Sequence, residues 1–270
     1  MNRRKRNIAL SVFAAAAAGL CLYADNKRID VQEIPVKLAG LPKAFNGFRI
    51  AHLSDLHLPN CACNPLKLAE IVKRIKPDAI ALTGDLVDRF TYFDADGLSA
   101  VTKMLADIAP CFAVVGNHEV KSGVVPEWAG ILKRSGVTVL SGKPTEVRRG
   151  EDRIIFWGLP DGNPFRLYRS GTEDDIEVVL SHYPENIQQY VSAGLRLVLT
   201  GHAHGGQWRF AGRGLISPGE GLFPKFTSGL YVVNNTKMIV SRGLRNGIPV
   251  RIFNSPHIPV VVLQKEYRSV

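Results

Sequence analysis

Five short polar motifs between residues 55 and 204 hold five of the chain's seven histidines, together with aspartates and one asparagine. They are Asp55-Leu56-His57, Gly84-Asp85-Leu86-Val87-Asp88, Gly116-Asn117-His118-Glu119, Ser181-His182 and Gly201-His202-Ala203-His204. Imidazole combined with carboxylate suits Mn, Fe, Zn or Ni as the bound ion. Seven of these side chains can act as ligands, which exceeds the usual demand of one ion: Asp55, His57, Asp85, Asn117, His182, His202 and His204. The motifs therefore predict two divalent metal ions.

The spacing within the motifs indicates which ligands share an ion. Side chains alternate along an extended segment, so Asp55 and His57 would point to one side and chelate one ion, as would His202 and His204. Two ions roughly 3.5–4 Å apart, bridged by a carboxylate and a hydroxide, provide a nucleophile and a clamp for in-line attack at phosphorus. This set of ligands thus predicts a hydrolase of phosphoric esters.

The motifs resemble those of the calcineurin-like metallophosphoesterases, whose pattern is DxH, GDxxD, GNH[D/E], H and GHxH, and the resemblance runs from about residue 45 to the end. It implies a four-layer α/β/β/α sandwich of two mixed sheets flanked by helices. It also implies one metal held by Asp55, His57 and His204, a second held by Asn117, His182 and His202, and Asp85 as the bridge.

The resemblance also implies roles for the residues beside the ligands. His118 would lie next to the metals and stabilise or protonate the leaving oxygen, with Glu119 orienting its ring. Asp88 would support the ligands from behind, and Arg89 would contact the phosphate. Protein Ser/Thr phosphatases have glycines where Leu58 and Phe90 stand here, and purple acid phosphatases have a tyrosine ligand at the position of Asp88.

A further likeness concerns the substrate. The segments 201–207 and 241–244, the second followed by a proline-rich strand, are similar to small membrane-associated bacterial phosphoesterases. Members of that branch are linked to lipid precursors such as UDP-2,3-diacylglucosamine, so the resemblance implies a phosphodiester or pyrophosphate that is lipid-linked. A nucleotide or nucleic-acid phosphodiesterase is the alternative, followed by a non-catalytic scaffold on the same fold.

Short apolar runs lead into the motifs and predict the elements that position them. Residues 48–53, 79–83 and 112–115 are typical of strands, and residues 65–75 and 96–108 have helical periodicity. Polar residues that follow such strands would meet at the carboxyl edge of the sheet. The second half predicts a helix at 184–192 and strands at 137–140, 146–148, 153–158, 176–181, 195–200, 230–234, 237–241 and 259–263. Two sheets packed face to face with helices outside would account for this order.

Length and charge favour one catalytic domain with an N-terminal extension. We expect a basic start and hydrophobic segment at 1–28, a linker and lead-in at 29–44, and a single α/β domain at 45–270. The net charge of +10, four units of which come from Arg3, Arg4, Lys5 and Arg6, suits an anionic substrate or membrane surface. The chain lacks a dense basic run interleaved with aromatics, so no specific nucleic acid is expected.

The N-terminal apolar run is a candidate membrane segment. Residues 8–24 carry no charge, and as a helix they would span roughly 25 Å, slightly less than a hydrocarbon core of about 30 Å. We expect a single uncleaved helix that anchors the chain and leaves the catalytic domain outside the cytoplasm. A cleaved signal and a soluble amphipathic start are the alternatives.

The cysteines do not form a disulfide framework, because Cys21 lies in the apolar run, Cys111 opens a strand, and Cys61 and Cys63 are too close for easy pairing. We expect Cys61 and Cys63 in a loop at the rim of the site, with a metal role as the alternative.

Four remaining residues are assigned by their surroundings. His52 lies inside the first predicted strand and His257 lies in the tail, and both are expected to be structural. Trp208 and Phe210 are expected either in the core or at a rim that faces lipid or substrate.

Overall fold

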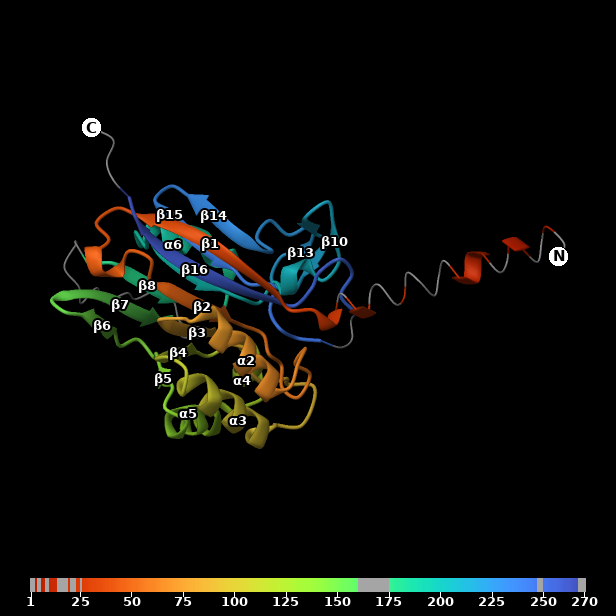
Figure 1. Cartoon of the computed structure of the whole chain (residues 1–270), viewed down its shortest axis with the longest axis horizontal. Coiled ribbons are helices and arrows are strands. Elements are labelled where there is room, and N and C mark those ends of the chain that lie inside the picture. Colours follow the sequence, from red (N-terminus) through yellow and green to blue (C-terminus); the bar gives the residue numbers. More distant parts are fainter. Residues whose placement is uncertain are drawn as a thin grey trace.

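Two six-stranded mixed sheets form the centre of the computed structural model (Figure 1). The structure describes residues 26–159, 175–246 and 250–266, together with residues 3, 6, 7, 10–13, 19, 23 and 24. The strands of the first sheet, in spatial order, are β1 (Asp30–Leu38), β16 (His257–Lys265), β2 (Arg49–Leu53), β3 (Ala79–Thr83), β4 (Cys111–Val114) and β5 (Thr138–Val139). β2 to β5 run parallel, and β16 pairs antiparallel with β2.

The second sheet has an antiparallel strand at each edge and parallel strands between them. Its spatial order is β14 (Gly229–Val233), β15 (Thr236–Val240), β9 (Leu197–Thr200), β8 (Glu177–Leu180), β7 (Asp152–Gly158) and β6 (Thr145–Arg149). β15, β9, β8 and β7 are parallel neighbours, whereas β14 and β6 pair antiparallel with β15 and β7. The expected pair of mixed sheets is confirmed.

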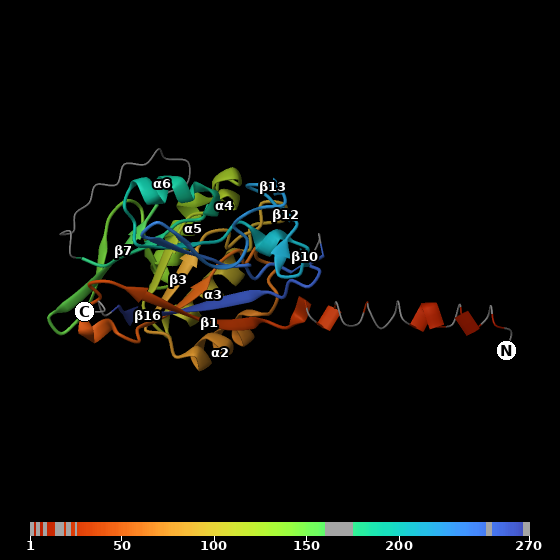
Figure 2. The same cartoon turned by 90° about the horizontal axis from the view of Figure 1, so that it is seen from above.

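Three apolar clusters arrange the sheets and helices in layers. One cluster fills the space between the sheets, where Phe112 of β4 stacks on Phe156 of β7 with ring centroids 4.3 Å apart. Another joins the outer face of the first sheet to three helices: α2 (Pro65–Ile75), α3 (Ala95–Ala106) and α5 (Val125–Arg134). A third joins the second sheet to α6 (Ile187–Ser192). Figure 2 shows α2 and α6 on opposite sides of the strands.

Helix α2 shows why these segments fold as the periodicity predicts. Asn64 accepts a hydrogen bond from the Lys67 N–H at 2.9 Å, and Pro65 occupies the first helical position, where its missing N–H costs nothing. Leu68, Val72 and Ile75 then bury one face against the sheet. The helix ends at Ile75, and the residue that caps it, Lys76, has a left-handed backbone.

The linker expected at residues 29–44 is corrected by the structure. Residues 30–38 form β1, which pairs in parallel with the whole of β16, from Asp30 beside His257 to Leu38 beside Lys265. The segment buries Ile34, Val36 and Leu38 between the sheets. The apolar alternation that buries these three residues is typical of a strand, so this part of the chain belongs to the domain.

The expected N-terminal anchor lies largely outside the described residues. Among the residues that the structure does describe, no helix combines the length and the apolar character needed to cross a bilayer.

Small elements complete the fold. α4 (Asn117–Lys121) follows β4, and short 3-10 helices occur at Pro184–Asn186 and His204–Gly206. A further 3-10 helix, Lys43–Phe45, lies before β2, where the Ala44 N–H donates to Asp152 at the start of β7. Two hairpins of two-residue strands follow: β10 (Arg209–Phe210) with β11 (Arg213–Gly214), and β12 (Ile216–Ser217) with β13 (Gly221–Leu222).

Candidate active site

The expected ligands sit in loops at the strand ends, with an unusual backbone conformation. Five of them have positive φ, a region that few residues other than glycine adopt: Asp55 (52°), His57 (48°), Asp85 (52°), His202 (65°) and His204 (47°). The argument from side-chain alternation in extended segments was therefore wrong. Its pairing of Asp55 with His57 holds, but His202 and His204, which it also paired, fall into different groups of potential ligands. Tight turns aim these side chains inward. They are held by two backbone hydrogen bonds of 3.0 Å, in which the Asp55 N–H donates to Gly84 O and the His57 N–H donates to Asp85 O. Such clustered outliers are typical of functional sites.

Asp55, His57 and His204 form one buried group whose ligand atoms all lie within 4.8 Å of one another. His204 Nε2 is 3.8 Å from Asp55 Oδ1, and the Asp55 carboxylate accepts the His202 N–H at 3.1 and 3.2 Å. Within the described part of the chain, neither ring nitrogen of His57 has a hydrogen-bond partner, although the residue is almost fully buried. A metal ion would satisfy such a nitrogen, so the donor set fits.

The second group gathers around His182, which comes from the loop after β8. Its Nε2 atom lies 3.1 Å from Asn117 Oδ1, 3.1 Å from His202 Nδ1 and 3.2 Å from Asp85 Oδ2. Its Nδ1–H donates to Thr83 O at 2.8 Å, which leaves Nε2 available as a ligand. Four potential ligand atoms thus converge on one point, as a second cation requires.

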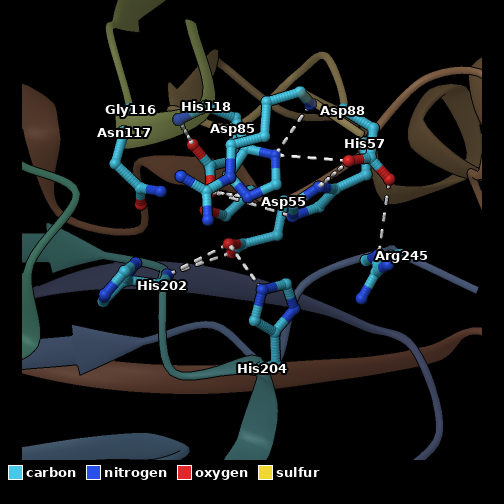
Figure 3. Close-up of polar contacts among 12 residues, drawn as sticks. Asp55, His57, Asp85, Asp88, Gly116, Asn117, His118, His202, His204 and Arg245 are labelled. Atoms are coloured by element: carbon cyan, nitrogen blue, oxygen red, sulfur yellow. Dashed lines mark hydrogen bonds and ion pairs between the residues drawn. The ribbon is translucent and has the colours of Figure 1, made fainter. Parts of the chain in front are cut away.

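Asp85 lies between the two groups. Its Oδ2 atom is 3.2 Å from His182 Nε2. Figure 3 shows Asp85 beside His57 and His118: Oδ2 is 3.7 Å from His57 Nε2, and Oδ1 accepts the His118 N–H at 2.8 Å. Burial raises its pKa, but the neighbouring His182 and His57 hold that pKa well below its usual range. Asp85 is therefore a carboxylate in contact with both groups.

Glu119 does something other than the expected orienting of His118. Its fully buried carboxylate accepts four backbone N–H groups: Gly116 at 2.8 Å, Asp85 at 3.0 Å, Leu86 at 2.7 Å and Val87 at 3.1 Å. The first of these bonds caps α4, and the other three hold the loop that carries Asp85. Burial and the Asp85 charge raise the pKa of Glu119 to about 7, while the N–H donors favour its charged form.

The ring of His118 is held from the opposite side by the Arg89 backbone. The Arg89 N–H donates to Nδ1 at 3.1 Å, and Asp88 Oδ1 lies 3.4 Å from the same nitrogen. Burial lowers the pKa of His118 to about 4, so the ring is neutral. With Nδ1 accepting, the proton resides on Nε2, which lies 3.8 Å from Asp85 Oδ2.

A cavity of about 600 Å³ opens above these groups. Three cationic side chains line it, those of Arg89, Lys121 and Arg245, together with Phe90 and Tyr183. Such a mouth suits an anionic substrate that extends beyond a phosphate group.

The segment after β15 also contacts the site, although the sequence alone assigned it no role there. Gly243 packs against Asp55: a Cβ atom there would lie 2.6 Å from Asp55 Cβ. Arg245 Nε is 3.7 Å from Asp88 Oδ2, and Asn254 Nδ2 donates to His204 O at 2.8 Å. In the sequence, the run Ser241-Arg242-Gly243-Leu244 indicated only a likeness to one branch of the family. Its contacts with the site could not be predicted from that likeness.

The residues outside the motifs divide clearly. His52 and His257 are buried and hydrogen-bonded, to Thr83 and Gln32. The backbone of Cys61 forms an isolated β-bridge with Arg245, which lines the cavity. The groups of described residues that could hold a metal contain neither Cys61 nor Cys63. Trp208 and Phe210 are 41% and 75% exposed, so they do not belong to the core.

The family model of calcineurin-like phosphoesterases matches residues 48–206, which hold all of these groups. The chain belongs to this family. It is a metal-dependent phosphoesterase whose buried His/Asp groups form a plausible dinuclear centre.

Relatives extend the similarity beyond the motifs. The chain is 28% identical to the uncharacterized metallophosphoesterase YkuE of Bacillus subtilis, covering 93% of this chain and 91% of that protein. It is also 28% identical to a transmembrane protein with metallophosphoesterase domain of Danio rerio, over 97% of this chain, and spans only 63% of that protein's length. UDP-2,3-diacylglucosamine pyrophosphatase LpxG of Chlamydia muridarum is 22% identical over 94% of this chain and 96% of its own.

Proposed function

We propose that the chain is a dinuclear phosphodiesterase or pyrophosphatase that acts on a membrane lipid or lipid precursor. The observation that carries the dinuclear part is the Asp85 carboxylate, which contacts His57 of one group and His182 of the other. Asp55, His57 and His204 would hold one ion, Asn117, His182 and His202 the second, and Asp85 would be shared. Two divalent ions held there would supply an activated water and neutralise charge on the phosphoryl oxygens.

The side chains around the ligands would assist the leaving group and bind the phosphoryl oxygens. His118 lines the cavity, and its Nε2–H would donate a hydrogen bond to the leaving oxygen. Transfer of the proton itself would start from the ring protonated on both nitrogens, which returns to neutral imidazole. Asp88, 3.4 Å from Nδ1, would stabilise the ring whenever that nitrogen is protonated. Arg89 and Arg245 line the cavity and would bind the non-bridging oxygens of the substrate.

Two observations support a substrate larger than a phosphate monoester. The cavity combines cationic side chains with apolar ones, Phe90, Ile216 and Pro218, and so offers contacts to groups on both sides of a phosphoryl centre. LpxG, named as a pyrophosphatase of a diacylated sugar nucleotide, matches nearly the full length of this chain.

We also propose that residues 8–24 anchor the chain in a membrane with the catalytic domain outside the cytoplasm. The support is the uncharged run itself, preceded by Arg3, Arg4, Lys5 and Arg6. An anchored chain should sediment with membranes whether or not metal is present. Limited proteolysis near Lys27 should release the catalytic domain into solution.

The test is hydrolysis by the full-length chain, stripped of metal and then loaded with Mn²⁺. The substrates are bis-p-nitrophenyl phosphate, p-nitrophenyl phosphate and UDP-2,3-diacylglucosamine. We expect turnover of the diester and the lipid substrate only with metal, and loss of both in Asp85→Asn, with exposed Asp107→Asn as the control. Preference for soluble nucleotides over dispersed lipid would replace the substrate proposal by the nucleotide alternative. Full turnover in Asp85→Asn would contradict the dinuclear mechanism.

A further inference from the structure

Large apolar side chains gather on two short segments beside the cavity. Among the described residues from 26 to 266, fourteen large hydrophobic side chains are exposed, and seven of these come from segments 208–223 and 250–253. We call six of them the apolar crown: Trp208 (41% exposed), Phe210 (75%), Leu222 (70%), Phe223 (77%), Val250 (52%) and Phe253 (74%). Aromatic side chains this exposed are costly in water, so a surface of this kind indicates a partner.

Hydrogen bonds join the two segments into one surface. The Trp208 indole N–H donates to Val250 O at 3.0 Å, and the Arg209 N–H donates to Ile252 O at 2.9 Å. Leu215 joins the two hairpins, because its N–H donates to Trp208 O at 2.8 Å and its O accepts the Phe223 N–H at 2.8 Å. The crown is therefore a feature of the folded domain.

The crown adjoins the mouth of the candidate active site. Ile216, which lines the cavity, pairs across a hairpin with Leu222 of the crown. Gln207, next to Trp208, lines the same cavity. Whatever covers the crown also lies next to the cavity mouth.

The chain enters the domain at the same place. Asn26 is buried and donates to Arg251 O at 3.1 Å, between Val250 and Phe253 of the crown. The uncharged run 8–24 immediately precedes this contact in the sequence. Figures 1 and 2 place β10 and β13 at the end of the molecule where β1 begins.

The charges around the crown match an anionic surface. Arg213 and Lys225 lie exposed among its residues, and Lys27 and Arg28 are exposed beside its point of entry. The one acidic residue of segment 207–228, Glu220, turns a carboxylate oxygen inward to the Phe226 N–H at 3.0 Å. Aromatic tips flanked by basic side chains are the composition of surfaces that insert into the headgroup region of a bilayer.

We propose that the apolar crown docks on an anionic lipid bilayer and turns the cavity mouth toward the headgroups. Docking is a property of the crown, separate from the N-terminal run. The further consequence, that the substrate enters from the bilayer, rests on the proposed function.

Trp208 provides a direct test in the full-length chain. The other tryptophans, Trp128 and Trp157, are only 1% and 3% exposed, so bromine on lipid acyl chains would quench Trp208 selectively. We expect quenching with brominated vesicles that contain phosphatidylglycerol, its disappearance in Trp208→Phe, and weaker quenching with neutral vesicles.

The variant Phe210→Ser with Phe223→Ser separates the crown from the N-terminal run. Loss of two exposed phenyl groups should weaken the crown's insertion by at least about tenfold, and quenching should fall with it. Val232→Ser, on an exposed face of β14, is the matched control. If the double variant does not fold by circular dichroism, Arg213→Glu with Lys225→Glu tests the same surface through its charge.

Three outcomes would overturn the proposal. Trp208 open to acrylamide but not to brominated lipid, in a chain that sediments with vesicles, would show that the crown faces water. Trp208 shielded from both quenchers would show that protein covers it. Unchanged quenching in the folded double variant would show that the crown does not hold the domain on lipid. Hydrolysis of the soluble diester is measured in parallel, so that a docked but inactive chain refutes the proposed function alone.

Discussion

The substitution Glu119→Gln separates two roles for this residue. The sequence resemblance implies that Glu119 orients His118, whereas its carboxylate in fact accepts four backbone N–H groups from the loops that carry Asp85 and Gly116. Glutamine keeps the shape of the side chain and one acceptor oxygen. The other oxygen becomes an NH₂ group that faces two N–H donors.

The size of the effect follows from those contacts. Glutamine would satisfy one pair of N–H groups and leave the other pair buried without an acceptor, because Glu119 is 0% exposed. Each unsatisfied buried donor costs about 1–3 kcal/mol, so the free energy of unfolding should fall by about 2–6 kcal/mol. For a domain of this size the melting temperature should drop on the order of 10 °C.

The assay is thermal unfolding of metal-free Glu119→Gln beside wild type, followed by metal content and diester turnover after reloading. Metal-free samples are needed because bound ions would stabilise either protein by mass action. The control is Glu70→Gln on the exposed face of α2, which removes the same charge without removing a buried acceptor.

An unchanged melting temperature with a large loss of turnover would refute this reasoning and restore the orienting role. A lowered melting temperature, with turnover recovering at low temperature and high metal concentration, would support a loop-holding role.

Three more outcomes are expected. His118→Ala should slow hydrolysis of a diester with an alkyl leaving group by about 10²–10⁴-fold, and that of a p-nitrophenyl diester less, because p-nitrophenolate leaves without a proton; equal losses would argue against proton donation. Gly243→Ala should lower metal affinity by about 10–100-fold, since its Cβ would lie 2.6 Å from Asp55 Cβ, whereas Gly142→Ala, at the same φ of +73° in open space, should keep both ions by elemental analysis. Chelator should lower the melting temperature by at least about 5 °C relative to protein with saturating Mn²⁺, and no shift would mean that the ions are not part of the folded site.

Much of the layered architecture could be predicted because short-range rules decide it. The runs before Asp55, Asp85 and Asn117 are strands where their apolar pattern predicts them, and α2 begins at its Asn64 cap. β1 was missed because the alternation at 34–38 is short and its partner, β16, lies more than 200 residues away. No local pattern encodes a partner at that separation.

The sequence by itself determined the chemistry: the residue types and order of five motifs specify histidine and carboxylate ligands for two ions, and with them the family. Only the tertiary structure decided how they meet. Left-handed turns, rather than alternation along a strand, aim Asp55 and His57, because Gly84 and Asp85 on the neighbouring loop bind their backbone N–H groups. Glu119 became a clamp for that loop because folding buried it among N–H donors. The apolar crown formed from segments 208–223 and 250–253 because hydrogen bonds between distant loops, which no sequence period records, brought them together.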